Sequence, residues 1–368
     1  MTVKDIQDII EQWAPKAIAW EKDNVGLQIG DPAIELTGIL VALDATERTI
    51  AETKRRHANL LVSHHPLLFK PIHSVTPRND TGRCVGALIR ERIALYSAHT
   101  NLDFTRGGTS FALAEALGLR DVGFLVKSYQ IQKKIVTFVP PDHVKSLMQA
   151  MAEAGAGRIG NYEFCSFRTE GKGTFKGNES SHPSAGKRGV LEEVNEVRLE
   201  MLASEWDVPR VVDAMKRAHP YEEVAFDVFP TQNVSDDYGM GIVGELERPM
   251  ELGALLALVK KALGIRALRH SSGPGRKVRR VAACGGSGSD LTDEAVKRGC
   301  DVFITADVKY HKFHDADGRI VLIDAGHYET EFPVVHALVR RLKQELRRSR
   351  ARVPVFATRS STNPIVYV

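Results

Sequence analysis

The sequence predicts a two-part α/β domain with an inserted α+β domain of the ferredoxin-like plan, and three observations support this fold class. Short apolar runs alternate with helical patterns up to about residue 117, which is typical of a largely parallel sheet. Between about Lys127 and Gln232 a strand–helix–strand unit occurs twice, as in ferredoxin-like domains. From about Tyr238 the first alternation resumes. We therefore expect the α/β domain at 1–126 and 236–368 and the insert at 127–235.

Size and composition restrict the class of protein. A chain of 368 residues is long for one core, and 43% hydrophobic with 26% charged residues is ordinary for a globular protein. The net charge of +4 is small for this length and does not indicate a nucleic-acid partner. Four scattered cysteines without a Cys-x-x-Cys pair argue against a disulfide framework and suit a reducing cytosol. No signal peptide and no apolar run of membrane-spanning length is evident, so we expect a cytoplasmic protein without a membrane partner.

The first part of the α/β domain opens with a helix that a capping box at Thr2 and Asp5 begins and that Pro15 ends. A turn-rich segment at 23–32 surrounds a short strand. The alternating elements that follow are strands at 38–44, 60–63 and 93–98 and helices at 46–57, 82–92 and 109–117.

The insert and the second part follow the same reasoning. In the insert we expect strands at 134–139, 162–168, 196–201 and 224–229, helices at 144–151 and 208–218, and a loop at 171–189. In the second part we expect strands at 241–246, 278–283, 301–305, 319–324 and 353–358, helices at 252–263 and 291–298, and a long helix ending near 350. The basic end of that long helix is either a nucleic-acid patch or, as we favour, a solvated terminus stabilised by the helix dipole.

The strand at 60–63 ends in His64, His65 and Pro66, and the prediction of function begins there. Pro66 disfavours helical backbone at His65, so both histidines are expected in extended chain. Neighbouring extended residues point to opposite sides, so the two imidazoles suit two adjacent ions better than one shared ion. The alternative is that one histidine caps a turn and the other packs.

Open α/β sheets bind ligands beyond the carboxyl ends of their strands. Three expected strand ends carry metal-competent side chains, which we place at one edge of one sheet: His64 with His65, His99 with Asp103, and His327 with Glu331. The last pair is four residues apart and faces one way if a helix begins near His327. Imidazole nitrogen and carboxylate oxygen suit zinc, iron, manganese and other divalent ions.

This set exceeds what one tetrahedral site requires, and a carboxylate can bridge two ions, for which Glu331 is the candidate. Two ions about 3.5–4 Å apart can share a hydroxide and act together in hydrolysis. His99 is either a sixth ligand or an outer group that moves protons, and we favour the second role.

With these residues in view, the sequence resembles the Nif-three-like dinuclear-metal proteins, also called GTP cyclohydrolase I type 2 homologues. The resemblance covers nearly the whole chain through the motifs DNVGLQIGD, LDAT, SHHPLLF, SAHTNLD, YGMGIVGEL, CGGSGSD, DVFITADVKYHKFHDA and DAGHYETE. The insert is similar to nitrogen-regulatory and copper-tolerance trimer folds. One departure is Ala306, where the resemblance leads us to expect Gly.

The resemblance implies a toroidal homohexamer with two divalent ions per subunit, zinc foremost and iron or manganese as alternatives. It implies the ligands His64, His65, Asp103, His327 and Glu331, the set already chosen from the residues. We therefore expect a metal-dependent hydrolase of unknown small-molecule substrate. The alternatives are a non-catalytic metal-binding, storage or chaperone-like hexamer, and a GTP cyclohydrolase activity implied by the family name alone.

Weaker signals leave alternatives open. The glycine turn at 284–289 is a tight structural turn or an anion cradle, and it lacks the residues of a P-loop. Lys309, His311 and His314 hold an anionic substrate or are surface charges. His219 belongs to a helix end or, less in keeping with Pro220, to a second metal site. Asp44 lies near the expected site or caps the next helix.

Overall fold

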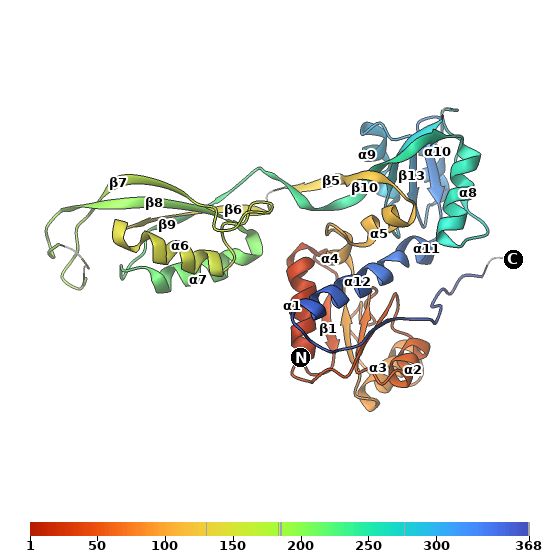
Figure 1. The fold of residues 1–368 in the computed structure, drawn as a ribbon, viewed down its shortest axis with the longest axis horizontal. Helices are drawn as coiled ribbons and strands as arrows, with labels where there is room; N and C mark the ends of the chain where they lie inside the picture. Colours follow the sequence, from red (N-terminus) through yellow and green to blue (C-terminus); the bar gives the residue numbers. More distant parts are fainter. Residues whose placement is uncertain (130, 183, 185, 276, 367–368) are drawn as a thin grey trace. The chain divides into compact units, whose positions relative to one another are not determined.

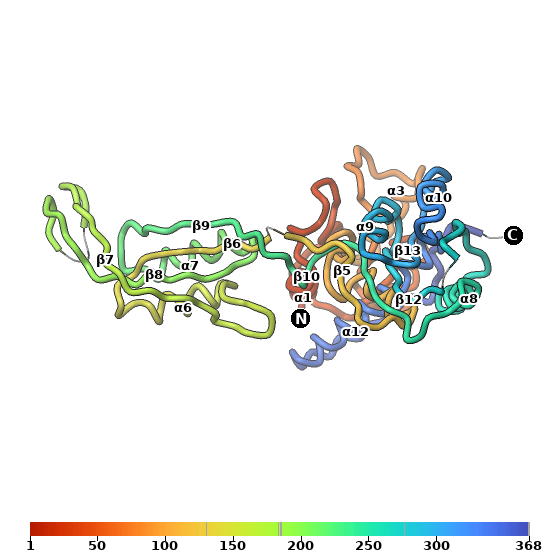
Figure 2. Tube along the Cα trace, turned by 90° about the horizontal axis from the view of Figure 1, so that it is seen from above, coloured from red at the N-terminus to blue at the C-terminus, as the bar shows by residue number. Residues whose placement is uncertain are grey.

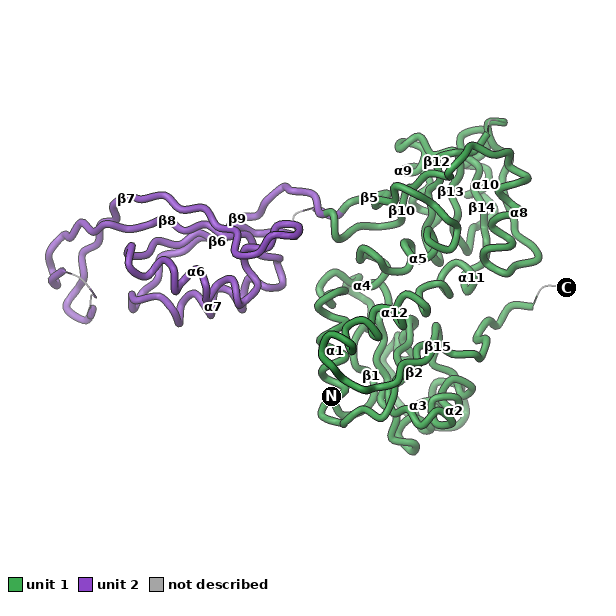
Figure 3. The backbone as a smooth tube through the Cα atoms, in the orientation of Figure 1, with its two compact units in different colours: residues 1–127, 236–368 green, residues 128–235 purple. Residues whose placement is uncertain are grey.

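The computed structural model describes residues 1–129, 131–182, 184, 186–275 and 277–366, and it divides into two compact units (Figures 1 and 3). The first unit comprises 1–127 and 236–368, and the second comprises 128–235. The chain leaves the first unit after one strand, β5 (Arg120–Tyr129), and returns through its neighbour in the sheet, β10 (Val234–Met250) (Figure 2). Among the described residues, no helix combines the length and apolar character needed to cross a membrane.

The first sheet of unit 1 has the order β1-β4-β3-β2-β15, in which β1 is antiparallel to β4 and the other pairs are parallel. Its strands are β1 (Gly26–Ile29), β2 (Ile39–Ala42), β3 (Leu60–Ser63), β4 (Ala94–Ser97) and β15 (Val355–Ala357). β2, β3 and β4 are buried along their whole length, as parallel strands covered on both faces are.

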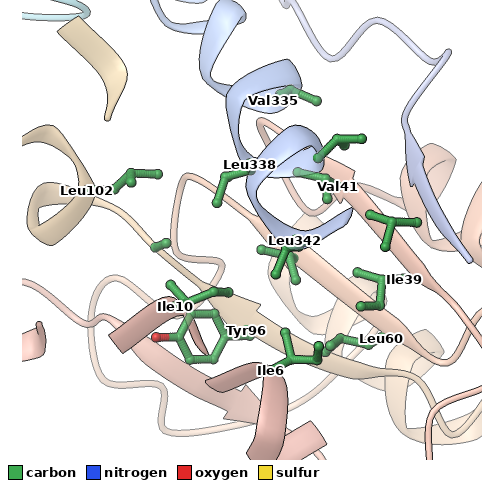
Figure 4. Packing of buried hydrophobic residues seen from close by; sticks show 14 of the residues in the cluster. Ile6, Ile10, Ile39, Val41, Leu60, Tyr96, Leu102, Val335, Leu338 and Leu342 are labelled. Atoms are coloured by element: carbon green, nitrogen blue, oxygen red, sulfur yellow. The ribbon is translucent and has the colours of Figure 1, made fainter. Parts of the chain in front are cut away.

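Helices cover both faces of this sheet. On one face α1 (Val3–Trp13) and α12 (Pro333–Arg348) pack against the strands, and the side chains of Ile6, Leu338 and Tyr96 meet there (Figure 4). On the other face lie α2 (Glu47–Arg55) and α3 (Asp80–Arg90). The predicted capping box begins α1, because Thr2 accepts from the amide of Asp5 while Asp5 accepts from that of Thr2.

The second sheet of unit 1 has the order β11-β14-β13-β12-β10-β5, with β12, β13 and β14 parallel. Besides β5 and β10, its strands are β11 (Arg269–His270), β12 (Val278–Ala283), β13 (Val302–Thr305) and β14 (Val321–Asp324). The helices α5 (Thr109–Ala116) and α8 (Leu252–Leu263) cover one face, and α9 (Thr292–Lys297) and α10 (Tyr310–Ala316) cover the other. The expectation of one sheet is therefore wrong: the alternating elements form two.

Two features of the second sheet differ from the sequence prediction. β5 was not expected, and β10 is longer than the predicted strand 241–246. The added parts are mostly exposed or half-buried, and their one apolar run, at 124–126 of β5, is only three residues long and was not recognised as a strand. The long C-terminal helix is also divided, into α11 (His327–Glu331) and α12, because Pro333 has no amide hydrogen to continue the ladder.

Unit 2 has the strand order β7-β8-β6-β9, and each neighbouring pair is antiparallel. Its elements are β6 (Gln132–Val139), α6 (Val144–Glu153), β7 (Phe167–Phe175), β8 (Glu192–Ser204), α7 (Val208–Ala218) and β9 (Phe226–Pro230). Leu147 and Met151 of α6 and Val211 and Met215 of α7 share one core with the sheet. Numbered along the chain, the strand order is 4-1-3-2, which is the predicted ferredoxin-like fold.

The strand expected at 162–168 and the loop expected at 171–189 are partly wrong, because β7 occupies 167–175. Glycine is unusual within a strand, and it marks close approach of another group. A Cβ on Gly173 would lie 2.0 Å from Glu196 Oε2 of the neighbouring strand. Residues 183 and 185 of the expected loop lie outside the described residues.

The segment after β15 is fixed to α2 by the buried carboxylate of Glu52. This carboxylate accepts hydrogen bonds from Thr358 Oγ1 at 2.7 Å, from Ser360 Oγ at 2.9 Å and from the amide of Arg359 at 3.1 Å. Arg56 donates to it from within the helix at 3.0 Å. Burial opposes the charge of Glu52, but the hydrogen bonds from Thr358, Arg359 and Ser360 outweigh it and lower its pKa to about 2.

We expect Glu52→Gln to lower the free energy of unfolding by about 2 kcal/mol at pH 7, because it weakens hydrogen bonds to a buried charge. The folded pKa lies below the ordinary value of 4.5, so the stabilisation is complete above that pH and is lost as the pH falls towards 2. Urea unfolding at pH 7 and pH 3 measures both effects, and the difference from the wild type shrinks at the lower pH.

Glu91→Gln is the matched control, because it removes a carboxylate from the more exposed Lys54–Glu91 ion pair. Its effect should stay within about 0.5 kcal/mol. Equal effects of the two variants would contradict the anchoring role of Glu52.

Candidate metal centre

The predicted ligands follow the ends of strands in two different sheets. In the first sheet His64 and His65 follow β3, while His99 follows β4 and precedes the short helix α4 (Thr100–Asp103), which ends in Asp103. In the second sheet α11 follows β14 and carries His327 and Glu331 at its two ends. The prediction of one sheet edge is therefore wrong, because the site lies between two sheets.

The residues nevertheless converge on the carboxylate of Glu331. Its Oε2 lies 2.8 Å from His65 Nε2 and 3.0 Å from His327 Nε2, and these two nitrogens are 3.4 Å apart. Its Oε1 lies 3.9 Å from His64 Nε2, which is 3.5 Å from Asp103 Oδ1. The two oxygens of Glu331 thus face two different groups of side chains, as a carboxylate that bridges two ions does.

All four imidazoles are held through Nδ1. His64 Nδ1 lies 2.7 Å from the carbonyl oxygen of Ala98, and His65 Nδ1 lies 2.7 Å from Asp44 Oδ1. The Nδ1 atoms of two more histidines meet carboxylates, His327 with Asp307 at 2.7 Å and His99 with Asp23 at 2.9 Å. A carbonyl or carboxylate oxygen can only accept, so each Nδ1 carries the proton. The Nε2 atoms are directed to the site, in the carboxylate–histidine arrangement common around metal ions.

Of these partners, sequence analysis considered only Asp44, and its capping alternative is wrong. Thr46 caps α2 by accepting from the amide of Thr49, while Asp44 holds His65 and accepts from Thr362 Oγ1. Asp23 and Asp307 were missed. Asp307 follows β13 at the ligand-binding end of its sheet, and this position was a usable signal. Asp23 opens the DNVGLQIGD motif in a turn before the mostly half-buried strand β1, and nothing in that motif indicates a contact with His99.

Burial governs the pKa of two ligand candidates. His64 is fully buried, and burial lowers its pKa to about 3, so the imidazole is neutral and able to bind a cation. Burial, reinforced by the nearby charge of Glu331, raises the pKa of Asp103 to about 7. A cation beside Asp103 would reverse that shift by favouring the carboxylate.

Charge pairing governs the pKa values of Glu331, His65 and His327. Burial opposes the charge of Glu331, but its contacts with His327 and His65 hold the pKa below the ordinary range. Burial also opposes protonation of His65, yet its contacts with Asp44 and Glu331 raise the pKa to about 10. The contact with Glu331 raises the pKa of His327 to about 9. Protons on these two imidazoles therefore balance Glu331 where no cation does so, and cation binding would release them.

Within the described residues, His64 Nε2 and Asp103 Oδ1 are two of eight buried side-chain nitrogen and oxygen atoms that lack a hydrogen-bond partner. Such atoms are normally paired, because burying them unpaired is unfavourable. Here they face each other at 3.5 Å beside Glu331, and a divalent cation would satisfy both. Two groups, His64 with His65 and His99, and His65 with His327 and Glu331, have ligand atoms within 4.8 Å of one another and can hold a metal ion. The donor set fits divalent first-row ions.

The glycine turn packs against Glu331. Its amides at Cys284, Gly286 and Gly288 donate within the protein, to Ile304 O, Thr330 Oγ1 and Thr305 Oγ1. Amides used in this way cannot cradle an anion, so of the two predicted roles the structural turn is supported. Gly286 has a φ of 64°, and a Cβ there would lie 2.1 Å from Glu331 Oε1. The departure at Ala306 leaves the turn intact, since the Ala306 amide donates to the Gly286 carbonyl.

Two weaker signals lie elsewhere. His219 uses both ring nitrogens, with Nε2 donating to Phe138 O at 3.0 Å and Nδ1 accepting from the Tyr221 amide, so it belongs to a structural turn. His311 and His314 lie on α10, where their rings contact the exposed ring of Tyr310. The role of Lys309, His311 and His314 towards an anionic substrate stays a prediction.

Comparison with known proteins places the chain in a family. Residues 1–364 match the profile of Duf34/NIF3, described as NGG1p interacting factor 3. This chain belongs to the DUF34/NIF3 family. It is 37% identical over 363 residues to a protein named GTP cyclohydrolase 1 type 2 homolog from Halalkalibacterium halodurans, covering 98% of this chain and 97% of that one. A Bacillus subtilis protein of the same name is 34% identical, covering 99% and 98%.

Solved structures agree with this membership. The crystal structure of a NIF3-related Bacillus cereus protein superposes with a TM-score of 0.87 at 36% identity, covering 100% of this chain and 99% of that one. A Staphylococcus aureus protein gives a TM-score of 0.81 at 31% identity with the same coverage. The predicted family and fold class are confirmed.

We expect Gly286→Ala in this NIF3-family protein to lose bound metal, because the new methyl group would displace Glu331. Gly299→Ala is the matched control: Gly299 has a φ of 67°, but its Cβ would meet nothing within 4 Å. Both variants should lose about 1–2 kcal/mol of stability from the left-handed backbone. Metal content by elemental analysis should fall in Gly286→Ala alone, and equal metal content in the two variants would contradict the close approach to Glu331.

Proposed function

We propose that this protein is a hydrolase that works with two divalent cations, zinc foremost, with iron or manganese as alternatives. The ligands in this proposal are His64, His65, Asp103, His327 and Glu331. The observation that carries it is the position of Glu331, whose two oxygens face different imidazoles at 2.8–3.0 Å and 3.9 Å. The unpaired atoms of His64 and Asp103 support it independently.

The chain's own groups prepare this site in defined ways. When bound, a pair of divalent cations supplies Lewis acidity and lowers the pKa of coordinated water. Asp44 and Asp307 fix the orientation of His65 and His327 and increase the basicity of their Nε2 atoms. Burial keeps His64 neutral, so that its Nε2 lone pair is available.

His99 and Asp23 form the part of the site suited to moving a proton. Burial opposes the charge of Asp23, but hydrogen bonds from His99 and Thr100 lower its pKa to about 2. This fixed carboxylate holds His99 Nδ1, and the ring of His99 lies 5.3 Å from that of His64 and 5.5 Å from that of His65. In this proposal His99 Nε2 takes a proton from the attacking water or gives one to the leaving group. The role of a further ligand remains the alternative, since His99 shares a possible ion site with His64 and His65.

The names of the relatives and one exposed ring beside His99 guide the choice of substrates to test. The curated relatives carry the name GTP cyclohydrolase 1 type 2 homolog, which makes GTP the first compound to test. Phe69 is 50% exposed and its ring lies edge-on to His99, with centroids 6.3 Å apart. An exposed aromatic face beside the candidate proton donor suits a substrate with a planar ring, which includes nucleotides.

The direct test is to strip the protein of metal, reload it with zinc, manganese or iron, and measure turnover of phosphoesters and nucleotides including GTP. We expect two ions per chain in the wild type and loss of ions in Glu331→Gln. Glu247→Gln, at an exposed pair with Arg120, is the control and should retain both ions. Tight binding of two ions without turnover of any compound would overturn the hydrolase proposal and favour a metal-binding or storage protein.

Asp23→Asn separates the two roles of His99. If His99 moves protons, turnover should fall by about 100-fold or more while metal content stays at the wild-type level. Asp31→Asn makes the same chemical change at an exposed turn of the same segment and should leave turnover unchanged. Loss of metal in Asp23→Asn would instead identify His99 as a ligand.

A further inference from the structure

The C-terminal segment 358–363, called the C-terminal strap below, contacts both sides of the proposed metal centre. On the side of the first sheet, Thr362 Oγ1 donates a hydrogen bond to Asp44 Oδ2. The other oxygen of the same carboxylate, Oδ1, lies 2.7 Å from His65 Nδ1. Thr362 is therefore one hydrogen bond removed from the group that orients a proposed ligand.

On the side of the second sheet, the strap contacts α11. Asn363 Nδ2 donates to Glu329 Oε1 at 2.9 Å, and Glu329 is buried in α11 between His327 and Glu331. Ser361 and Thr362 of the strap also lie beside the hydroxyl of Tyr328. The strap is thus hydrogen-bonded to α11 through Asn363 and Glu329, and its two preceding residues adjoin Tyr328.

The N-terminal end of the strap is anchored to α2 by hydrogen bonds. Thr358, Arg359 and Ser360 all donate to the carboxylate of Glu52 in α2, which packs on the first sheet. Only two residues lie between this anchor and Asn363, so the backbone of the strap has little conformational freedom. A short, anchored segment that contacts Asp44 and α11 at once couples the position of His65 to that of Glu331.

We propose that the C-terminal strap is a positioning element of the metal centre, in which Thr362 and Asn363 hold the His65 side and the α11 side at the separation that two cations require. This inference rests on the proposed metal-binding function. The physical reason is that the ligands come from two sheets, so their separation is not fixed by either sheet alone. Groups that orient metal ligands commonly change metal affinity by about 10–100-fold when they are removed.

The coupling must act in both directions. If the strap strengthens ion binding, ion binding must stabilise the strap by the same free energy, because linkage is reciprocal. Amide hydrogen exchange of the strap therefore gives a readout that does not depend on catalysis.

The test uses the full chain and Zn²⁺ alone, with affinity measured by competition with a chromogenic chelator. Thr362→Val removes the hydroxyl at nearly constant shape, and Asn363→Ala removes the contact with Glu329. We expect each to weaken Zn²⁺ binding about tenfold. Thr362→Ser keeps the hydroxyl and should restore wild-type affinity.

Thr37→Val is the control for loss of a hydroxyl hydrogen bond as such, because exposed Thr37 donates to His57 O at 2.7 Å away from the proposed ligands. Its Zn²⁺ affinity should equal that of the wild type. Thermal unfolding of the metal-free proteins shows whether any variant fails to fold. If one does, hydrogen exchange of the wild type with and without Zn²⁺ tests the coupling between the strap and the metal centre. Zn²⁺ should slow exchange at 358–363 in the wild type.

The outcomes are distinct. Failure of the wild type to bind Zn²⁺ would overturn the metal centre and the strap together. Wild-type binding with unchanged affinity in Thr362→Val and Asn363→Ala would overturn the strap alone. Exchange at 358–363 that is insensitive to Zn²⁺ would also overturn it.

Discussion

The buried carboxylate of Glu331 is the constraint on which the arrangement of the first unit depends. A buried charge is unfavourable without compensation, and the two imidazoles that compensate it come from different sheets: His65 from the first and His327 from the second. The two sheets must therefore be held together closely enough for these groups to meet. Part of that connection is covalent, because α11 follows β14 of the second sheet and runs directly into α12, which packs on the first. Phe332 keeps helical backbone angles between the two helices, so the ligand-bearing turn leads straight on into the packing helix.

The elements that could be predicted from sequence are those whose burial is indicated by a few consecutive apolar residues. The run at Leu60 to Ser63 is wholly buried and was recognised at its observed bounds. The first part of β10 was missed because it is mostly exposed or half-buried, and β5 was missed because its apolar run spans only residues 124–126. The assignment of strands to two sheets was also missed. A strand's pattern records that it is buried, but its partners are set by contacts across hundreds of residues, as with Val355 beside Ile39.

At the site, too, local sequence patterns identify some residues, whereas contacts between distant parts of the chain determine the others. The six candidate side chains could be chosen because each follows an expected strand end, and the structure brings them to one place. Their orienting partners are separated from them by 20 to 76 residues, and an aspartate in a turn has many ordinary roles. The glycine turn at 284–289 had two interpretations because glycine is suited both to a tight structural turn and to a loop that binds an anion. The position of Glu331 beside Gly286 is a tertiary fact that no local spacing contains.

The path of the chain between the units has a consequence for how a second unit can be accommodated in this fold. The segment 128–235 departs from β5 and rejoins at β10, which are adjacent strands of one sheet. A connection between adjacent strands crosses nothing else in the fold, so its length is free from topological restriction. An entire folded module therefore lies between two neighbouring strands, and its presence leaves the path of the chain through the rest of the first unit unchanged.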